Sequence, residues 1–395
     1  MFRKSFSNNR YNHKSRFHSF RRNNNGQKKN INISRYINTS QSETVESNIS
    51  ITHRFEDFPI SDKLKQNIIS HGYKVPTPIQ DQAIMPILQG RDLVGIANTG
   101  TGKTAAFLIP LINKIIQNRT EKVLIIVPTR ELAVQIDEEL KAFAKFLNIY
   151  SVLCIGGASI NRQISEIRRN PHLVIGTPGR LKDLIQRRML NLATFKNIVL
   201  DEVDRMIDIG FIHDIRFIVS LLPKSRQSLF FSATVPQEVN GIVQSFLTNP
   251  VTISVKVQEI AEHIHQDVIR VKDKNEKIEK LNSMLRQSEF TKVLIFGRTK
   301  WGVERLSRSL KEKGFNADSI HGNKSQNQRL TVLSMFKQNR LQILVATDIA
   351  ARGLDIVDVS HVINYDEPST YTDYIHRIGR TGRAQKSGKA VTFVD

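Results

Sequence analysis

A glycine-rich segment that ends in lysine and threonine is the strongest chemical signal in the sequence. Residues 97–104 read Ala-Asn-Thr-Gly-Thr-Gly-Lys-Thr and lie between a short apolar run and a helical pattern. Glycines let backbone N–H groups curl around phosphate oxygens, and the following helix adds its dipole. Lys103 can reach the β- and γ-phosphates of a nucleotide, and the Thr104 hydroxyl can bind Mg²⁺. The segment predicts a phosphate-binding loop, whose other residues are Asn98, Thr99, Gly100, Thr101 and Gly102.

A cluster of acidic residues follows another apolar run about 100 residues later. Residues 201–204 read Asp-Glu-Val-Asp. Carboxylates at the C-terminal end of a parallel strand lie where open α/β sheets bind ligands. Asp201 would hold Mg²⁺ through water, and Glu202 would orient and deprotonate the water that attacks a γ-phosphate. An isolated acidic cluster is more often a solvated turn, but the phosphate loop upstream favours the catalytic interpretation.

The third signal is a run of arginines near the end of the chain. Residues 376–383 read His-Arg-Ile-Gly-Arg-Thr-Gly-Arg. Arginines separated by glycines make a poor helix and a poor core, and their guanidinium groups suit contacts with phosphate. We predict that Arg380 and Arg383 act on the γ-phosphate, with a basic surface turn as the alternative. If they lie on a second lobe, hydrolysis requires that the two lobes close on each other.

The elements that must position these residues are short β-branched runs that alternate with helical patterns of 10 to 17 residues. This alternation is typical of βαβ units in a parallel sheet. The pattern restarts after a stretch without clear periodicity, so we expect two α/β lobes, at residues 51–257 and 258–395. The predicted strands are Leu93–Ala97, Val123–Val127, Ser151–Cys154, Leu173–Gly176, Ile198–Leu200, Ser228–Ser232, Val293–Phe296, Asp318–Ile320, Ile343–Ala346 and His361–Asn364.

Charge and composition narrow the class of protein further. The 395 residues carry a formal net charge of +21, which favours a polyanionic partner. Residues 1–50 lack periodicity, and the first 40 hold ten Lys or Arg and no acid, so we expect a disordered basic tail. This tail would bind RNA, serve only solubility, or act as a transit peptide. A single cysteine, Cys154, and no apolar run of membrane length predict a cytoplasmic protein without a membrane span.

Together these motifs resemble the DEAD-box ATP-dependent RNA helicases of helicase superfamily 2, over residues 55–395. The resemblance implies two tandem RecA-like parallel-sheet lobes that bind ATP and Mg²⁺. Phe55 and the segment 72–80, Gly-Tyr-Lys-Val-Pro-Thr-Pro-Ile-Gln, are similar to the family's Q motif. The resemblance implies that Gln80 reads adenine and that Phe55 and Tyr73 pack on the base.

The remaining motifs occur in family order. On the first lobe the resemblance assigns to RNA the residues Pro128, Thr129, Arg130, Gly157, Thr177 and Arg180. On the second lobe it assigns to RNA the residues Arg298, Gln326, Arg329 and Thr347. It gives Asp355 to the ATP ribose, and it couples the ATP state to RNA remodelling through Ser232, Thr234, Asp204 and His376.

The acidic motif has Val203 where the family has alanine, and we expect this side chain to point into the core. The resemblance implies RNA-stimulated ATP hydrolysis and local, sequence-independent unwinding of short RNA duplexes. An RNA-binding clamp or annealing chaperone and a superfamily 2 DNA helicase are the alternatives. We expect a monomer in a bacterial-type cytoplasm that binds single-stranded RNA and short duplexes, with ribosomal or ribonucleoprotein proteins as candidate partners.

Overall fold

The computed structural model describes residues 51–98, 100–234, 241, 246–255, 264–351, 356, 359–382 and 388–394. The basic tail, Thr99, the expected lobe boundary near residue 258, Asp355 and Arg383 lie outside the described residues. Within the described ranges, no helix is long and apolar enough to cross a membrane.

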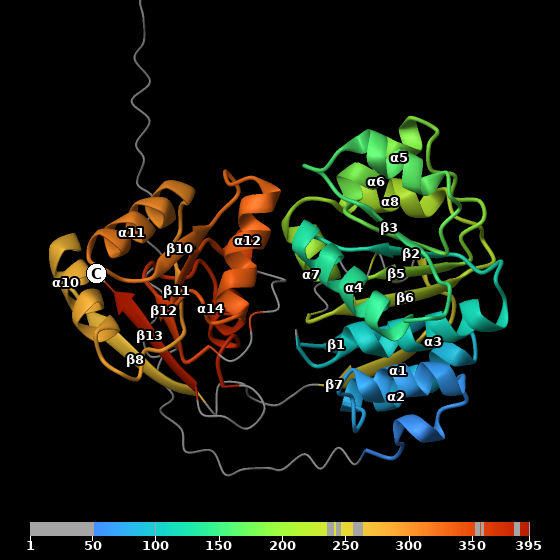
Figure 1. Cartoon of the computed structure of the whole chain (residues 1–395), viewed down its shortest axis with the longest axis horizontal. Helices are drawn as coiled ribbons and strands as arrows, with labels where there is room; N and C mark the ends of the chain where they lie inside the picture. Colours follow the sequence, from blue (N-terminus) through green and yellow to red (C-terminus); the bar gives the residue numbers. More distant parts are fainter. Residues whose placement is uncertain are drawn as a thin grey trace, which may run out of the picture.

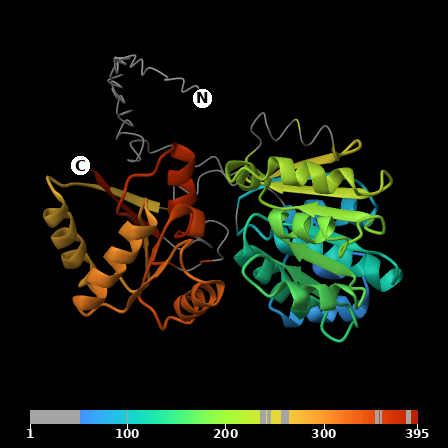
Figure 2. The ribbon, with the colours of Figure 1, turned by 90° about the horizontal axis from the view of Figure 1, so that it is seen from above.

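Two α/β lobes lie side by side (Figures 1 and 2). The first lobe is built on a seven-stranded parallel sheet with the strand order β3-β4-β2-β5-β6-β1-β7. Its strands are β1 Leu93–Ala97, β2 Val123–Ile126, β3 Ser151–Cys154, β4 Leu173–Gly176, β5 Asn197–Leu200, β6 Gln227–Ser232 and β7 Val251–Val255. Its helices are the short η2 Phe55–Asp57, then α1 Asp62–Ser70, α2 Pro78–Leu88, α3 Lys103–Gln117, α4 Arg130–Phe143, α5 Ile160–Ile167, α6 Pro178–Gln186, α7 Val203–Asp208 and α8 Ile212–Ser220.

The second lobe contains a six-stranded parallel sheet with the order β10-β11-β9-β12-β13-β8. Its strands are β8 Ile264–Arg270, β9 Val293–Phe296, β10 Ala317–Ile320, β11 Ile343–Ala346, β12 His361–Asn364 and β13 Gly388–Val394. Its helices are α10 Lys274–Leu285, α11 Lys300–Glu312, α12 Gln326–Lys337, α13 Asp348–Ala351 and α14 Tyr371–Ile378. The predicted α/β class with two parallel-sheet lobes is confirmed.

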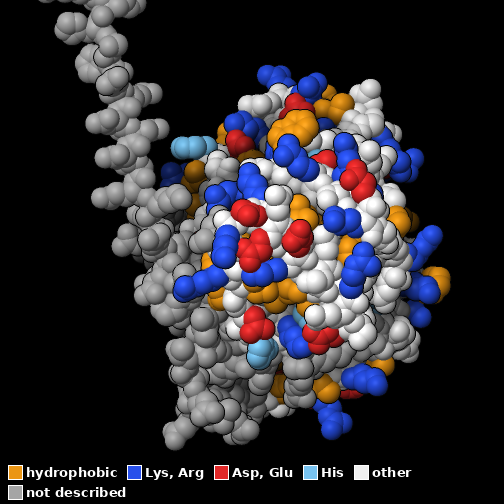
Figure 3. Space-filling model, turned by 90° about the vertical axis from the view of Figure 1, so that its left-hand side faces the viewer, with side chains coloured by type: hydrophobic (Ala, Val, Ile, Leu, Met, Phe, Trp, Pro, Cys, Tyr) orange, Lys and Arg blue, Asp and Glu red, His pale blue; other side chains and the backbone are white. Residues whose placement is uncertain are grey.

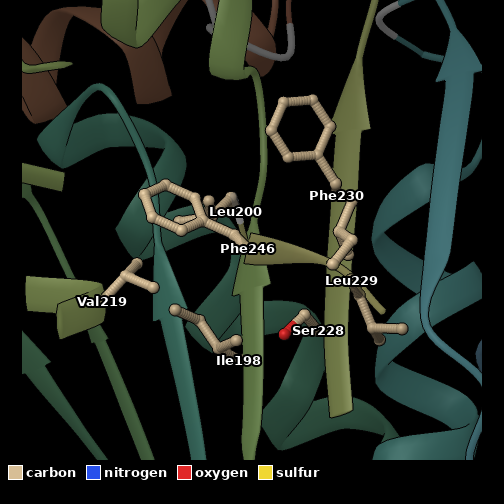
Figure 4. Close-up of a pocket in the computed structure, with 8 residues that line it drawn as sticks. Ile198, Leu200, Val219, Ser228, Leu229, Phe230 and Phe246 are labelled. Carbon is tan, nitrogen blue, oxygen red and sulfur yellow. The ribbon is translucent and has the colours of Figure 1, made fainter. Parts of the chain in front are cut away.

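The sheet of the first lobe has an apolar layer on both faces, as expected where helices cover a parallel sheet on both sides. One layer packs α1 to α4 against the sheet, and the other packs α6 to α8. Val203 lies in the second layer and is fully buried, as the sequence predicts. Figure 4 shows a small apolar pocket there, where Phe246 packs over β5 and β6 beside Ile198 and Val219.

Helix starts in this fold sit directly after strand ends. Gly102 adopts a left-handed conformation with φ of 95° and precedes the first residue of α3, which is Lys103. Thr129 caps α4 by accepting a hydrogen bond from the backbone N–H of Leu132 at 3.3 Å. Because all strands of a sheet run the same way, these loops gather at its C-terminal edge. The candidate site residues of each lobe therefore share one edge.

Close backbone packing at the end of β4 gives a stability prediction. A Cβ on Gly176 would lie 2.6 Å from the carbonyl oxygen of Cys154, whereas a Cβ on Gly179 would meet no atom within 4 Å. We expect Gly176→Ala to lower the free energy of unfolding by about 2 kcal/mol, because neither β3 nor α6 can yield without repacking. Gly179→Ala is the matched control and should be neutral or stabilising, since Gly is unfavourable inside a helix. Urea unfolding of both variants measures the difference, and equal stabilities would contradict the packing argument.

Candidate nucleotide and nucleic-acid site

The phosphate loop is held by contacts with its own flanking strand and with the N-terminal motif. Lys103 is buried and its Nζ donates to the carbonyl of Ala97 at 2.9 Å. Gln80 Nε2 donates to the carbonyl of Gly102 at 3.1 Å, and Gln80 Oε1 accepts from the N–H of Thr77 at 2.9 Å. A Cβ on Gly102 would lie 2.3 Å from Gln80 Nε2, so only glycine fits there. The amide predicted to read adenine thus also fixes the shape of the loop.

The two aromatic residues of that motif pack against each other. Phe55 is fully buried and meets the ring of Tyr73 edge to face, with centroids 6.1 Å apart. The Tyr73 hydroxyl donates to Glu139, and its ring also meets Phe143. Phe55 therefore supports Tyr73 from within the core, and contact of either ring with adenine stays a prediction.

The acidic motif lies at the end of β5, next to the phosphate loop. Asp201 and Glu202 are both almost completely buried. Burial raises the pKa of Asp201 to about 6, although the charge of Lys103 works in the opposite direction. Glu202 has a left-handed backbone with φ of 52°, which is unfavourable for a residue with a Cβ and is typical of functional sites.

Three cations keep Glu202 ionised. Burial alone would raise the pKa of Glu202, but the charges of Arg205, Lys103 and Arg380 outweigh it and hold the pKa below its ordinary value. Arg205 Nη1 lies 3.0 Å from Glu202 Oε2. Arg380 belongs to the second lobe and is itself buried. Positive charges from both lobes therefore stabilise the ionised form of Glu202, the carboxylate predicted to act as general base.

Arg205 also connects the lobes directly. Its Nη2 donates to the backbone carbonyl of Ile349, on α13 of the second lobe, at 2.9 Å. One guanidinium group thus holds the candidate base and a second-lobe carbonyl through two different nitrogens, whereas the side chain of lysine has a single nitrogen. Arg205 is not among the residues predicted from the sequence, although it directly follows the acidic motif.

A second link between the lobes centres on Glu131. This buried carboxylate of α4 accepts from Gln326 Nε2 at 3.0 Å and lies 3.1 Å from Arg329 Nη2, both on α12. Gln326 and Arg329 were predicted to bind RNA, and here they bind the first lobe. Glu131 was not predicted as a site residue, because its partners lie almost 200 residues away in the sequence. The signal that could have found it is an acidic residue within a motif predicted to contact phosphates.

The residues predicted to couple ATP state to remodelling form one hydrogen-bond network. Asp204 Oδ2 accepts from both the N–H and the hydroxyl of Thr234 at 3.0 Å. The N–H of Asp204 donates to Ser232 Oγ at 3.2 Å, and that hydroxyl donates to the carbonyl of Thr234 at 2.7 Å. The acidic motif and the end of β6 are thus joined. His376 is partly buried on α14, and its role in coupling stays a prediction.

The residues predicted to bind RNA on the first lobe follow strand ends at one edge. The Arg130 guanidinium packs against the glycine pair, so closely that a Cβ on Gly157 would lie 2.2 Å from Nη1. Arg180 Nη1 donates to Gln163 Oε1 at 3.0 Å and to the carbonyl of Ala158 at 3.3 Å. Two further helices begin here, α4 after Pro128 and Thr129 and α6 after Thr177. These contacts join the segments that follow β2, β3 and β4 to one another.

On the second lobe the equivalent edge carries Arg298, which is exposed and whose N–H donates to Asp366 at 2.7 Å. Thr347 is buried at the end of β11. Arg377, which the sequence analysis grouped with the phosphate-directed arginines, has a different position. It is buried, pairs with both carboxylate oxygens of Asp348 at 2.6 and 2.8 Å, and stacks on the ring of Phe296. Arg377 therefore builds the lobe, since its charge is already satisfied.

The donors present suit a magnesium ion that is held mainly by the nucleotide. Among the described residues, no group of three or more His, Cys, Asp and Glu could hold a metal ion alone. Asp201 and the partly buried Thr104 supply one carboxylate and one hydroxyl beside the phosphate loop. Mg²⁺ characteristically takes one or two protein oxygens and completes its shell with phosphates and water. The residues therefore fit this ion.

Comparisons with known proteins agree with these motifs. Residues 77–242 match the family described as DEAD/DEAH box helicase, and residues 276–385 match the helicase conserved C-terminal domain. The ATP-dependent RNA helicase CshA of Listeria monocytogenes is 45% identical over 86% of this chain and 66% of the relative. CshA of Limosilactobacillus reuteri is 44% identical over 86% of this chain and 69% of the relative. The chain spans about two thirds of the length of these relatives.

Solved structures give the same result for the fold. S. cerevisiae Dbp5 bound to RNA and ADP BeF3 superposes with a TM-score of 0.78 at 30% identity, covering 87% of this chain and 90% of Dbp5. Mss116p bound to ssRNA and AMP-PNP superposes with a TM-score of 0.77 at 32% identity, covering 85% of this chain and 72% of Mss116p. Both likenesses include both lobes.

The raised pKa of Asp201 predicts that this carboxylate costs stability in the protein without ligands. Its folded pKa of about 6 exceeds the ordinary value of 3.8, so the cost is fully present above pH 6 and disappears as the pH falls below about 4. We expect Asp201→Asn to raise the free energy of unfolding by about 3 kcal/mol at pH 7.5. Urea unfolding between pH 4 and 8 measures the gain, which should shrink toward acid pH. Glu279→Gln, an exposed control on α10, should change little; a gain independent of pH would contradict the assignment.

The double contact of Arg205 predicts a kinetic effect without loss of ATP binding. Arg205→Lys keeps a charge but cannot hold both Glu202 and the Ile349 carbonyl, so we expect kcat at saturating RNA to fall at least about tenfold, with little change in KM for ATP. The pKa of Glu202 should rise, which moves the acidic limb of the pH–rate profile upward. Arg216→Lys, an exposed control on α8, should match the wild type. An unchanged rate and pH profile for Arg205→Lys would refute the role of Arg205.

Proposed function

The chain belongs to the DEAD-box family of ATP-dependent RNA helicases, and from this premise we propose that it couples ATP hydrolysis to lobe closure on a single RNA strand. The observation that carries the proposal is the convergence on Glu202 of Lys103 and Arg205 from the first lobe and Arg380 from the second. A base that needs charge from both lobes works only when they are closed.

The residues of the site divide the chemistry among them. Lys103 exchanges the Ala97 carbonyl for phosphate oxygens, since both compete for the same ammonium group. Glu202, kept ionised by its cations, accepts the proton of the attacking water. Arg380 and Arg383 neutralise charge that develops on the γ-phosphate. Mg²⁺, held by Thr104 and Asp201, would supply charge neutralisation at the phosphates. We assign Asp355 to the ribose and Gln80 to adenine.

RNA binding would occur along the C-terminal edges of both sheets. Arg298 lies on the loop after β9, and Arg130 and Arg180 lie in the first turns of α4 and α6, which follow β2 and β4. There they would meet sugar and phosphate and leave the bases unread. Pro128, Thr129, Gly157, Thr177 and Thr347 would add backbone and hydroxyl contacts. Binding is then largely independent of sequence, and it favours single-stranded or A-form RNA over B-DNA. Dbp5 and Mss116p were both solved with RNA, which supports this ligand.

Hydrolysis would be transmitted to the RNA through the two links between the lobes. Loss of the γ-phosphate would remove the proposed contact between Arg380 and that group, and the contacts of Arg205 and Glu131 would then separate with the lobes. The network of Asp204, Ser232 and Thr234 would carry the change to the end of β6. We further propose that the protein acts as a cytoplasmic monomer on single strands and short duplexes.

Steady-state ATP hydrolysis with no nucleic acid, with single-stranded RNA and with DNA of the same sequence tests this function. We expect strong stimulation by RNA alone, because the proposed contacts include 2′-hydroxyl groups that DNA lacks. Equal stimulation by DNA would instead indicate a DNA helicase. Tight RNA binding without stimulation would indicate a clamp or annealing chaperone, and either result would overturn the proposal.

A further inference from the structure

The most exposed aromatic side chain beside the proposed RNA surface belongs to Trp301. Its side chain is 76% exposed, and it is the single tryptophan of the chain. Trp301 is the second residue of α11, which begins directly after β9 and the loop that holds Arg298. It therefore lies at the C-terminal edge of the second sheet, the edge that carries the other second-lobe motifs. None of the family motifs matched above includes this position.

The backbone beneath Trp301 is held rigidly. Thr299 Oγ1 accepts from the N–H of Gly302 at 3.0 Å, which fixes the first turn of α11. Val303 is fully buried, and a Cβ on Gly297 would lie 2.9 Å from its Cγ2, so the helix start is packed closely against the strand end. A large ring on a fixed backbone loses little entropy when it binds a flat partner.

The surroundings of Trp301 are basic. Arg298 and Lys300 are exposed on its N-terminal side, and Arg305, one turn later on the same face of α11, is exposed as well. The nearest acid of the helix, Glu304, is engaged by Ser319, His321 and Lys324. The positive charges around the indole are therefore available to a polyanion.

Phe146 on the first lobe is an exposed aromatic ring whose face is occupied by cations of the protein itself. It is 77% exposed, but the ammonium groups of Lys145 and Lys63 lie over it at 5.2 and 5.7 Å. It also follows the C-terminal end of α4, at the edge opposite the motifs. Within the part of the chain that the structure describes, neither ring nor cation stacks on Trp301. Its face is left for a ligand.

We propose that Trp301 is a stacking platform for a base of the RNA strand, at the point where the strand leaves the surface of Arg298. Figure 3 shows that, on the side of the second lobe that faces away from the first, basic side chains lie among acidic ones. Among its described residues that side carries no continuous basic face, whereas Arg298, Lys300 and Arg305 lie exposed around Trp301. Beside these cations a stacking contact, which every base can make, would hold the strand without reading its sequence. This inference rests on the proposed function only in taking RNA as the ligand.

Intrinsic fluorescence tests the proposal, because the tryptophan emission of the whole protein comes from Trp301 alone. The protein is titrated with fluorescein-labelled oligouridine in the presence of Mg²⁺ and a non-hydrolysable ATP analogue, and RNA anisotropy is followed in parallel. We expect the emission to be quenched as the anisotropy rises. An RNA of the same length with abasic sites keeps its phosphates and should bind without the full quench. Bound RNA with unchanged emission would overturn the proposal and leave the proposed function intact.

Variants provide the second readout. Trp301→Ala should weaken RNA binding about tenfold, and Trp301→Phe should retain most of the affinity. Phe146→Ala is the matched control, with equal exposure at the opposite edge, and should bind RNA as the wild type does. Equal affinities for Trp301→Ala and the wild type would overturn the proposal. Failure of the wild type to bind RNA at all would overturn both this inference and the proposed function.

Discussion

Two carboxylates that are buried at the end of one strand require positive charge, and the chain supplies it from three separate segments. Burial raises the pKa of Asp201, whereas Glu202 stays ionised because Lys103, Arg205 and Arg380 surround it. Charges that are taken out of water must be compensated by partners at short distance. Because one of these partners belongs to the second lobe, the electrostatics of Glu202, the proposed base, depend on how the lobes meet.

The parallel architecture makes this convergence possible. Each strand of a parallel sheet delivers its following loop to the same edge, so residues from distant parts of the sequence meet there without long excursions. The same rule brings Ser232 to Asp204, and Arg130 to the glycine pair at 156–157. Gln80, near the start of α2, reaches Gly102 at this edge although no strand precedes it within the described residues. The fold thus links the nucleotide loop, the acidic motif and the proposed RNA surface through short contacts.

Much of this arrangement follows from the sequence, since buried parallel strands are nearly continuous apolar runs. All ten predicted strands occur within one residue of their observed ends. Three observed strands, β7, β8 and β13, are absent from the prediction. The strands β7 and β8 alternate buried and exposed residues at sheet edges, which weakens their apolar signal. The candidate ATP residues were recognisable from local spacing. The partners of Glu131 and Arg205 were not, because contacts between lobes have no local pattern. The pairing of Arg377 with Asp348 was not predicted either, because the two residues are distant in sequence.

The central claim is that an arginine of the second lobe completes a base that lies on the first. Single-turnover ATP hydrolysis at saturating ATP and RNA, compared between the wild type and Arg380→Lys, tests it most directly. The account predicts a rate about 10³-fold lower for the variant, with ATP binding little changed, because a lysine cannot replace the guanidinium at the γ-phosphate. A variant that hydrolyses ATP at the rate of the wild type would contradict the account.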